Sequence, residues 1–211
     1  GYWEQRVPGT QAENLSDGEV RKMVQRAYSI SFPIIRDTDD KNVDAGAVIT
    51  VVPHDECGFL EFYVALVRES AGVPPALTPR LFGLKPGDRL FVGKKITGHY
   101  TLSTVADGQD VIFLATGTGE APHNYMLWEL LRNNHQGRIV AACCVRYGRD
   151  LAYRATHEKL MQTYPNYTYL AMTTRESPEP GGKRYVQDLL ISGELERVVG
   201  KPLDPAMTQV Y

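Results

Sequence analysis

Apolar and polar residues follow two different patterns in the first and second halves of this 211-residue chain. Up to about Leu102, apolar residues come in short or alternating runs separated by turn signals, which is typical of β-strands. Turns such as Lys85–Asp88, with its Pro-Gly pair, separate these runs, and their spacing indicates a small antiparallel barrel or sandwich. We predict strands over Met23–Ile30, Ala47–Val52, Leu60–Leu66 and Arg89–Val92.

Beyond about residue 109 the pattern becomes one of continuous apolar runs alternating with helical periodicity. Val111–Ala115 is such a run, and the glycine-rich turn Thr116–Gly119 follows it. The next stretch predicts an amphipathic helix, which we expect Gly137 to end, because its apolar residues recur four positions apart. These pairs are Met126 with Leu130 and Leu127 with Leu131.

The same alternation continues to the end of the chain. We predict further strands over Ile139–Val145 and Tyr167–Thr173, with helices near Leu151–Tyr164 and Tyr185–Ile191. Alternating strands and helices favour a doubly wound parallel sheet with right-handed crossovers. We therefore expect two domains, an antiparallel β-barrel over residues 1–106 and an α/β domain over residues 107–211.

Charge and composition exclude several classes of function for this chain. Lys and Arg total 23 against 25 for Asp and Glu, which argues against a dedicated nucleic-acid binder or a polybasic membrane-surface protein. No apolar run approaches the roughly 20 residues needed to span a bilayer. Cys143 and Cys144 sit in an apolar run and Cys57 stands apart, so we expect free, buried thiols in a reducing cytoplasm. Because the chain does not start with Met, we expect it to be the interior of a longer protein, lacking both ends.

The turn Thr116–Gly119 is a candidate nucleotide loop. It lies between a buried strand and a helix, where ligands of parallel sheets bind and where free helix N–H groups can face a phosphate. The alternative is a tight turn whose glycines serve backbone geometry alone. The turn lacks the Gly-Lys-Ser/Thr ending of a P-loop, which disfavours ATP hydrolysis.

Two groups of arginines could hold phosphates. Arg26 and Tyr28 share one face of a predicted strand, where a guanidinium can grip a pyrophosphate and a phenol can stack on a flat ring; the alternative is an exposed cross-strand pair. Arg146, Arg175 and Arg184 follow successive strands and can meet at one sheet edge, or can simply solvate loops. From Arg146 to Arg184 there are seven Lys or Arg against four Asp or Glu, an excess of three positive charges.

Together these motifs resemble the ferredoxin/flavodoxin–NADP reductase family. The resemblance spans nearly the whole chain and implies an FAD-binding β-barrel followed by an NADP-binding α/β domain. In the Arg-x-Tyr-Ser motif it implies that Arg26 binds the FAD phosphate, Tyr28 stacks on the isoalloxazine and Ser29 lies near flavin N5. Thr78 in Leu77–Leu81 would help hold the flavin.

In the second domain the resemblance implies a nicotinamide loop made by Thr116, Gly117, Thr118 and Gly119, with Thr116 nearest the ring. It implies that Arg146, Arg175 and Arg184 bind the adenosine 2′-phosphate and so favour NADP(H) over NAD(H). Glu120 stands where relatives usually carry an aliphatic residue, and its carboxylate either faces the ligand and repels phosphate or points away.

The implied activity is electron transfer between NADPH and ferredoxin or flavodoxin through FAD, with Ser29, Tyr28 and Thr116 nearest the chemistry. Two alternatives remain: the reductase component of an oxygenase system, and a non-catalytic flavin- or nucleotide-binding subunit. The five histidines show no paired metal spacing and the cysteines do not supply four thiolates, so we predict no metal or iron–sulfur site.

Overall fold

The computed structural model of the protein describes residues 6–31, 58–176 and 184–211. These residues divide into two compact units, the first within 1–28 and 63–99 and the second within 29–62 and 100–211. The predicted strand Ala47–Val52 lies outside the described residues. No helix in the described ranges combines the length and the apolar character that crossing a membrane requires.

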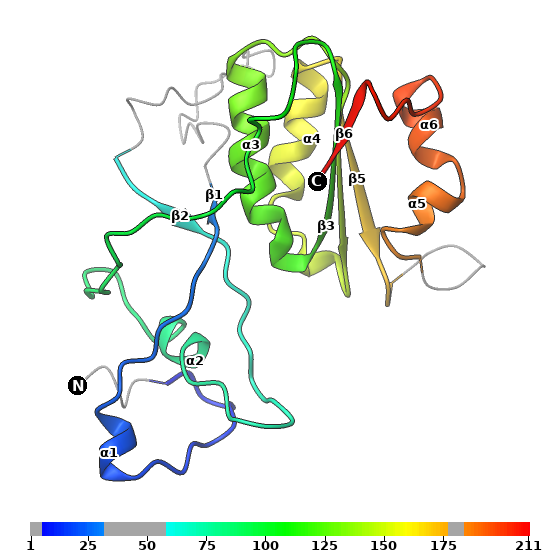
Figure 1. The fold of residues 1–211 in the computed structure, drawn as a ribbon. Helices are drawn as coiled ribbons and strands as arrows, with labels where there is room; N and C mark the ends of the chain where they lie inside the picture. Colours follow the sequence, from blue (N-terminus) through cyan, green and yellow to red (C-terminus); the bar gives the residue numbers. More distant parts are fainter. Residues whose placement is uncertain (1–5, 32–57, 177–183) are drawn as a thin grey trace, which may run out of the picture. The chain divides into compact units, whose positions relative to one another are not determined.

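A four-stranded parallel sheet forms the centre of the second unit (Figure 1). Its strands are β3 (Asp110–Thr116), β4 (Ile139–Val145), β5 (Tyr167–Thr173) and β6 (Thr208–Val210), in the order β5-β4-β3-β6. Every residue of β4 is buried, as expected for a strand covered on both faces. The carboxyl ends of β3, β4 and β5 therefore lie along one edge of the sheet.

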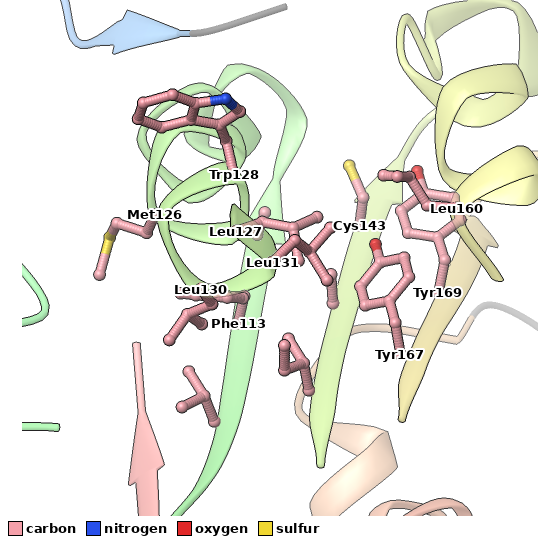
Figure 2. Packing of buried hydrophobic residues seen from close by; sticks show 14 of the residues in the cluster. Phe113, Met126, Leu127, Trp128, Leu130, Leu131, Cys143, Leu160, Tyr167 and Tyr169 are labelled. Carbon is pink, nitrogen blue, oxygen red and sulfur yellow. The ribbon is translucent and has the colours of Figure 1, made fainter. Parts of the chain in front are cut away.

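Helices cover both faces of this sheet. The helices α3 (Glu120–Arg132) and α4 (Arg154–Thr163) lie on one face, and α5 (Asp188–Ile191) and α6 (Glu194–Val199) lie on the other (Figure 1). Residues of β4 alternate between two apolar cores, so Cys143 packs with α3 and α4 while Cys144 packs with α5 and α6. Figure 2 shows the first core, in which Trp128 is fully buried. The predicted doubly wound arrangement is confirmed for this domain, and both thiols are free and buried as predicted.

Two details of the α/β unit differ from the prediction. Helix α3 ends at Arg132, and Asn134 rather than a glycine takes the left-handed conformation, with φ at 52°. Gly137 serves a different purpose, because a Cβ there would lie 1.9 Å from the carbonyl oxygen of Gln109. Helix α6 was not predicted. It is short, and glycines in the left-handed conformation, Gly193 and Gly200, flank its two ends.

Antiparallel pairing among the described residues is limited to β1 (Ile30–Ser31) with β2 (Glu61–Phe62). The predicted strand Met23–Ile30 is thus wrong except at its last residue, and Arg89–Val92 forms no strand. A strand requires a neighbouring strand for its backbone hydrogen bonds. Leu90, Phe91 and Val92 stay largely exposed, so their apolar character marks no core-facing strand here.

The first unit has two short helices, α1 (Asp17–Val20) and α2 (Thr78–Leu81). A partly buried ion-pair cluster joins its distant segments, because the Glu13 carboxylate accepts hydrogen bonds from both Arg6 and Arg80. Each arginine also donates to backbone carbonyls of this unit. These contacts pair the charges of all three side chains.

Candidate nucleotide-binding edge of the parallel sheet

The glycine-rich loop lies where strand β3 meets helix α3. Gly117–Gly119 form a single 3-10 turn, and Gly117 has a φ of +55°, a conformation that favours glycine. Thr116 is exposed at the end of β3. The first turn of α3 begins after Gly119 and has no side-chain cap, and the positive end of its helix dipole lies at this loop.

Arg146 and Arg175 lie together at the same edge of the sheet. The Arg175 backbone N–H donates to the Arg146 carbonyl oxygen at 3.0 Å, which extends the pairing of β4 and β5 beyond the strands themselves. Both side chains are exposed. Among the described residues no carboxylate forms an ion pair with either guanidinium.

Two guanidinium groups contact the side chain of Tyr147. Arg175 Nη1 donates to Tyr147 Oη at 3.2 Å, and Arg149 stacks over the ring with Cζ 4.6 Å from its centroid. In the same loop as Tyr147, the Gly148 N–H donates a hydrogen bond to the Glu176 carboxylate at 2.6 Å. Sequence reasoning missed Arg149, although it follows Arg146 by three residues in the same loop and adds positive charge to this edge.

Arg184 has a different environment. Its guanidinium forms an ion pair with Glu194, at the start of α6, and that carboxylate offsets its charge locally. The Arg184 carbonyl oxygen lies 3.7 Å from Cys144 Sγ, which places its backbone beside the end of β4. The three predicted arginines therefore differ in their surroundings, because a carboxylate neutralises the charge of Arg184.

Glu120 points away from the edge into the core. Only 3% of its surface is exposed, and its Oε1 accepts a hydrogen bond from Tyr169 Oη at 3.0 Å. His157 Nε2 lies 3.2 Å from the same oxygen. Of the two orientations considered for this side chain, the structure shows the second, so the carboxylate does not face a phosphate bound at the loop.

The predicted flavin residues lie mostly in the first unit. Arg26 and Ser29 are exposed, and Arg26 Nη1 donates to the Gln25 carbonyl oxygen at 2.7 Å. Tyr28 is half-buried, and this burial raises the pKa of its phenol. Thr78, the first residue of α2, accepts the Val67 N–H at 3.1 Å through Oγ1. Arg26, Tyr28 and Thr78 belong to the first unit, whereas the loop and the three arginines belong to the second.

Comparison with known proteins supports a nucleotide-binding role for this region. A family model described as an oxidoreductase NAD-binding domain matches residues 113–211. The flavodoxin/ferredoxin–NADP reductase of Shigella flexneri is 30% identical over 152 residues, or 72% of this chain and 59% of the relative. The ferredoxin–NADP reductase of Azotobacter vinelandii is 31% identical over 158 residues, or 68% of this chain and 56% of the relative. The chain thus spans somewhat more than half the length of these curated relatives.

Two solved structures share the fold at low sequence identity. A variant of the ferredoxin–NADP+ reductase of Plasmodium falciparum with 2′P-AMP has a TM-score of 0.54 and 17% identity, covering 75% of this chain and 79% of that one. The CS-b5R domains of human Ncb5or in the NAD+ form have a TM-score of 0.56 and 18% identity, covering 87% and 46%. The domain match and the curated relatives show that the chain is similar to flavodoxin/ferredoxin–NADP reductases and that residues 113–211 match an oxidoreductase NAD-binding domain.

Proposed function

We propose that this protein transfers electrons between NADPH and ferredoxin or flavodoxin through bound FAD. The observation that carries the proposal is that the Thr116–Gly119 loop, Arg146 and Arg175 lie at the carboxyl edge of one parallel sheet. Ligands of open α/β sheets bind outside this edge. Relatives of the chain are named for NADP, ferredoxin and flavodoxin, which supports the choice of nucleotide and partner.

The loop and the arginines suit different parts of the nucleotide. The first turn of α3, which has no side-chain cap, offers the positive end of its dipole to the pyrophosphate. Arg146 and Arg175 offer guanidinium groups to the 2′-phosphate, which can accept paired, charge-assisted hydrogen bonds. We expect a smaller contribution from Arg184, because Glu194 already accepts from its guanidinium.

Thr116 and the glycines position the nicotinamide end. Thr116 is exposed where β3 ends, and no atom lies within 4 Å of where a Cβ on Gly117 or Gly119 would stand. This lets the backbone approach a flat ring closely. Holding the ring in one orientation raises the rate of hydride transfer because the reacting groups no longer have to find that geometry.

Residues 1–106 form the FAD-binding β-barrel in this proposal, and residues 107–211 form the NADP-binding domain. Arg26 would hold the FAD phosphate, Tyr28 would stack on the isoalloxazine, Ser29 would lie near its N5, and Thr78 would help hold the flavin. Arg26 and Ser29 are exposed and Tyr28 is half-buried, so a ligand can reach all three. When bound, FAD accepts a hydride and passes electrons on singly. The buried free thiols Cys143 and Cys144 are consistent with work in the reducing cytoplasm.

An anaerobic spectrum tests this function. Purified protein with FAD should lose its yellow flavin absorbance when NADPH is added, and ferredoxin or flavodoxin should then reoxidise it. If NADPH leaves the flavin oxidised, the protein is a binding subunit and the proposed function is wrong. If the flavin is reduced but only an oxygenase component reoxidises it, the partner assignment alone is wrong.

A further inference from the structure

A buried polar cluster lies directly behind the glycine loop. Glu120, the first residue of α3, contacts Tyr169 on β5 and His157 on α4, through Oε1 at 3.0 and 3.2 Å. His157 Nδ1 in turn lies 2.8 Å from the hydroxyl of Tyr167. The His157 ring stacks on Tyr169, with centroids 4.2 Å apart and planes 20° apart. The cluster therefore joins the start of α3 to two other elements of the domain.

The surroundings of this cluster are apolar and close. Cys143 on β4 is buried beside it, and burial together with the Glu120 carboxylate raises the pKa of its thiol. Figure 2 shows Cys143, Tyr167, Tyr169 and Leu160 packed on the same side of the sheet. An aliphatic side chain would fill the position of Glu120 without removing a carboxylate from water. The carboxylate at this position therefore calls for a functional explanation.

Glu120 is also bonded to the loop itself. Its backbone N–H donates to the carbonyl oxygens of Gly117 and Thr118. The loop is open on one side, because no atom would touch a Cβ placed on Gly117 or Gly119. Cys143 Sγ lies 4.0 Å from the Gly117 carbonyl oxygen, a weak contact at most. The hydrogen bonds from the Glu120 N–H therefore link the backbone of the loop to the position of the Glu120 backbone.

We infer that Glu120 is a positioning residue for the nicotinamide loop. Its backbone N–H bonds to Gly117 and Thr118, while its buried carboxylate accepts a hydrogen bond from Tyr169 on β5 and lies beside His157 on α4. This inference rests on the proposed function and adds a residue whose side chain points away from the nucleotide. NADPH and NADH share the nicotinamide end. Loss of the Glu120 carboxylate, which we call the anchor, should therefore weaken the binding of both nucleotides alike, whereas loss of an arginine that binds the 2′-phosphate should weaken only that of NADPH.

Two variants remove the anchor to different degrees. Glu120→Ala deletes the carboxylate, and Tyr169→Phe deletes one donor with little change in volume. Glu120→Gln keeps an oxygen that can accept from Tyr169 and is the conservative rescue. Asn166→Ala is the matched control, because Asn166 Nδ2 donates to the carbonyl oxygens of His135 and Gly137, at the opposite edge of the same sheet.

Two measurements test the variants. Steady-state kinetics gives KM and kcat for both nucleotides, and hydrogen–deuterium exchange reports the opening of residues 116–121. In Glu120→Ala we expect KM for NADPH and for NADH to rise by the same factor, roughly tenfold, with lower kcat and faster exchange at the loop. Tyr169→Phe should show a smaller shift in the same direction, and Glu120→Gln should recover most of the loss. The control should lower the melting temperature without changing KM or loop exchange.

Unchanged KM, kcat and loop exchange in both Glu120→Ala and Tyr169→Phe would overturn the inference, even if both variants melt earlier. An effect on NADPH alone would also overturn it. Loop exchange does not depend on the redox reaction. If the unsubstituted protein fails to oxidise NADPH, the proposed function is lost, but faster exchange in the two variants would still support the anchoring role of Glu120.

Discussion

His123 makes a pH-dependent contribution to stability that can be worked out from its surroundings. The side chain is 5% exposed in the first turns of α3, and its Nε2 lies 2.7 Å from the hydroxyl of Tyr100. The ring of Phe113 packs against it at 5.0 Å between centroids. Burial lowers the pKa of His123 to about 4, although the charge of Glu120 acts in the opposite direction.

The sign and size of the effect follow from this pKa. In the unfolded chain the pKa of His123 is near 6.5. Between about pH 6.5 and pH 4 the imidazole is therefore protonated in the unfolded state but neutral in the folded state. The free energy of unfolding therefore falls as the pH falls through this window. The slope reaches about 1.4 kcal/mol per pH unit, for a total on the order of 3 kcal/mol. Above about pH 6.5 the contribution is fully present.

Urea unfolding at pH 7.5, 5.5 and 4.5 measures this term when the protein is compared with His123→Phe. The variant loses the contact with Tyr100 at every pH. Between about pH 6.5 and pH 4, however, its free energy of unfolding should fall by about 3 kcal/mol less than that of the unsubstituted protein. His99→Gln is the control, because His99 is exposed, and it should follow the unsubstituted protein. Parallel pH curves for His123→Phe and the unsubstituted protein would refute the reasoning.

Three further substitutions test the edge and the core. Arg175→Met should raise KM for NADPH roughly 10- to 100-fold while leaving KM for NADH unchanged, whereas Arg138→Met at the opposite edge should change neither in steady-state assays. Gly137→Ala should destabilise the domain by more than about 2 kcal/mol in urea unfolding, because its Cβ would meet the backbone of Gln109 at 1.9 Å. Trp128→Ala should cost about 3–5 kcal/mol by the same measurement, because the indole is fully buried.

The centre of the α/β domain could be predicted from the sequence because β4 is buried on both faces and gives a continuous apolar run over Ile139–Val145. Tyr167–Thr173 also forms a strand over the predicted range, although it is only partly buried. The placement of Arg146 and Arg175 at one edge also followed, because parallel strands share the direction of their carboxyl ends. The antiparallel region was harder to predict, since a short apolar run such as Arg89–Val92 says nothing about whether a partner strand lies beside it.

The environment of individual side chains could not be predicted, because it depends on partners distant in sequence. Glu120 is adjacent to the loop, but its orientation is set by Tyr169, 49 residues later. The charge of Arg184 is offset by Glu194 from a helix that the pattern did not predict. Local sequence thus indicated which residues reach the edge, whereas packing determined which of their charges remain available.

Calorimetric titration of the protein with NADP+ and with NAD+ tests most directly whether the carboxyl edge of the parallel sheet recognises a 2′-phosphate. We expect NADP+ to bind at least about tenfold more tightly than NAD+, since charge-assisted hydrogen bonds to the phosphate each contribute about 1.5–3 kcal/mol. Equal affinities for the two nucleotides, or no binding of either, would contradict the assignment of this edge.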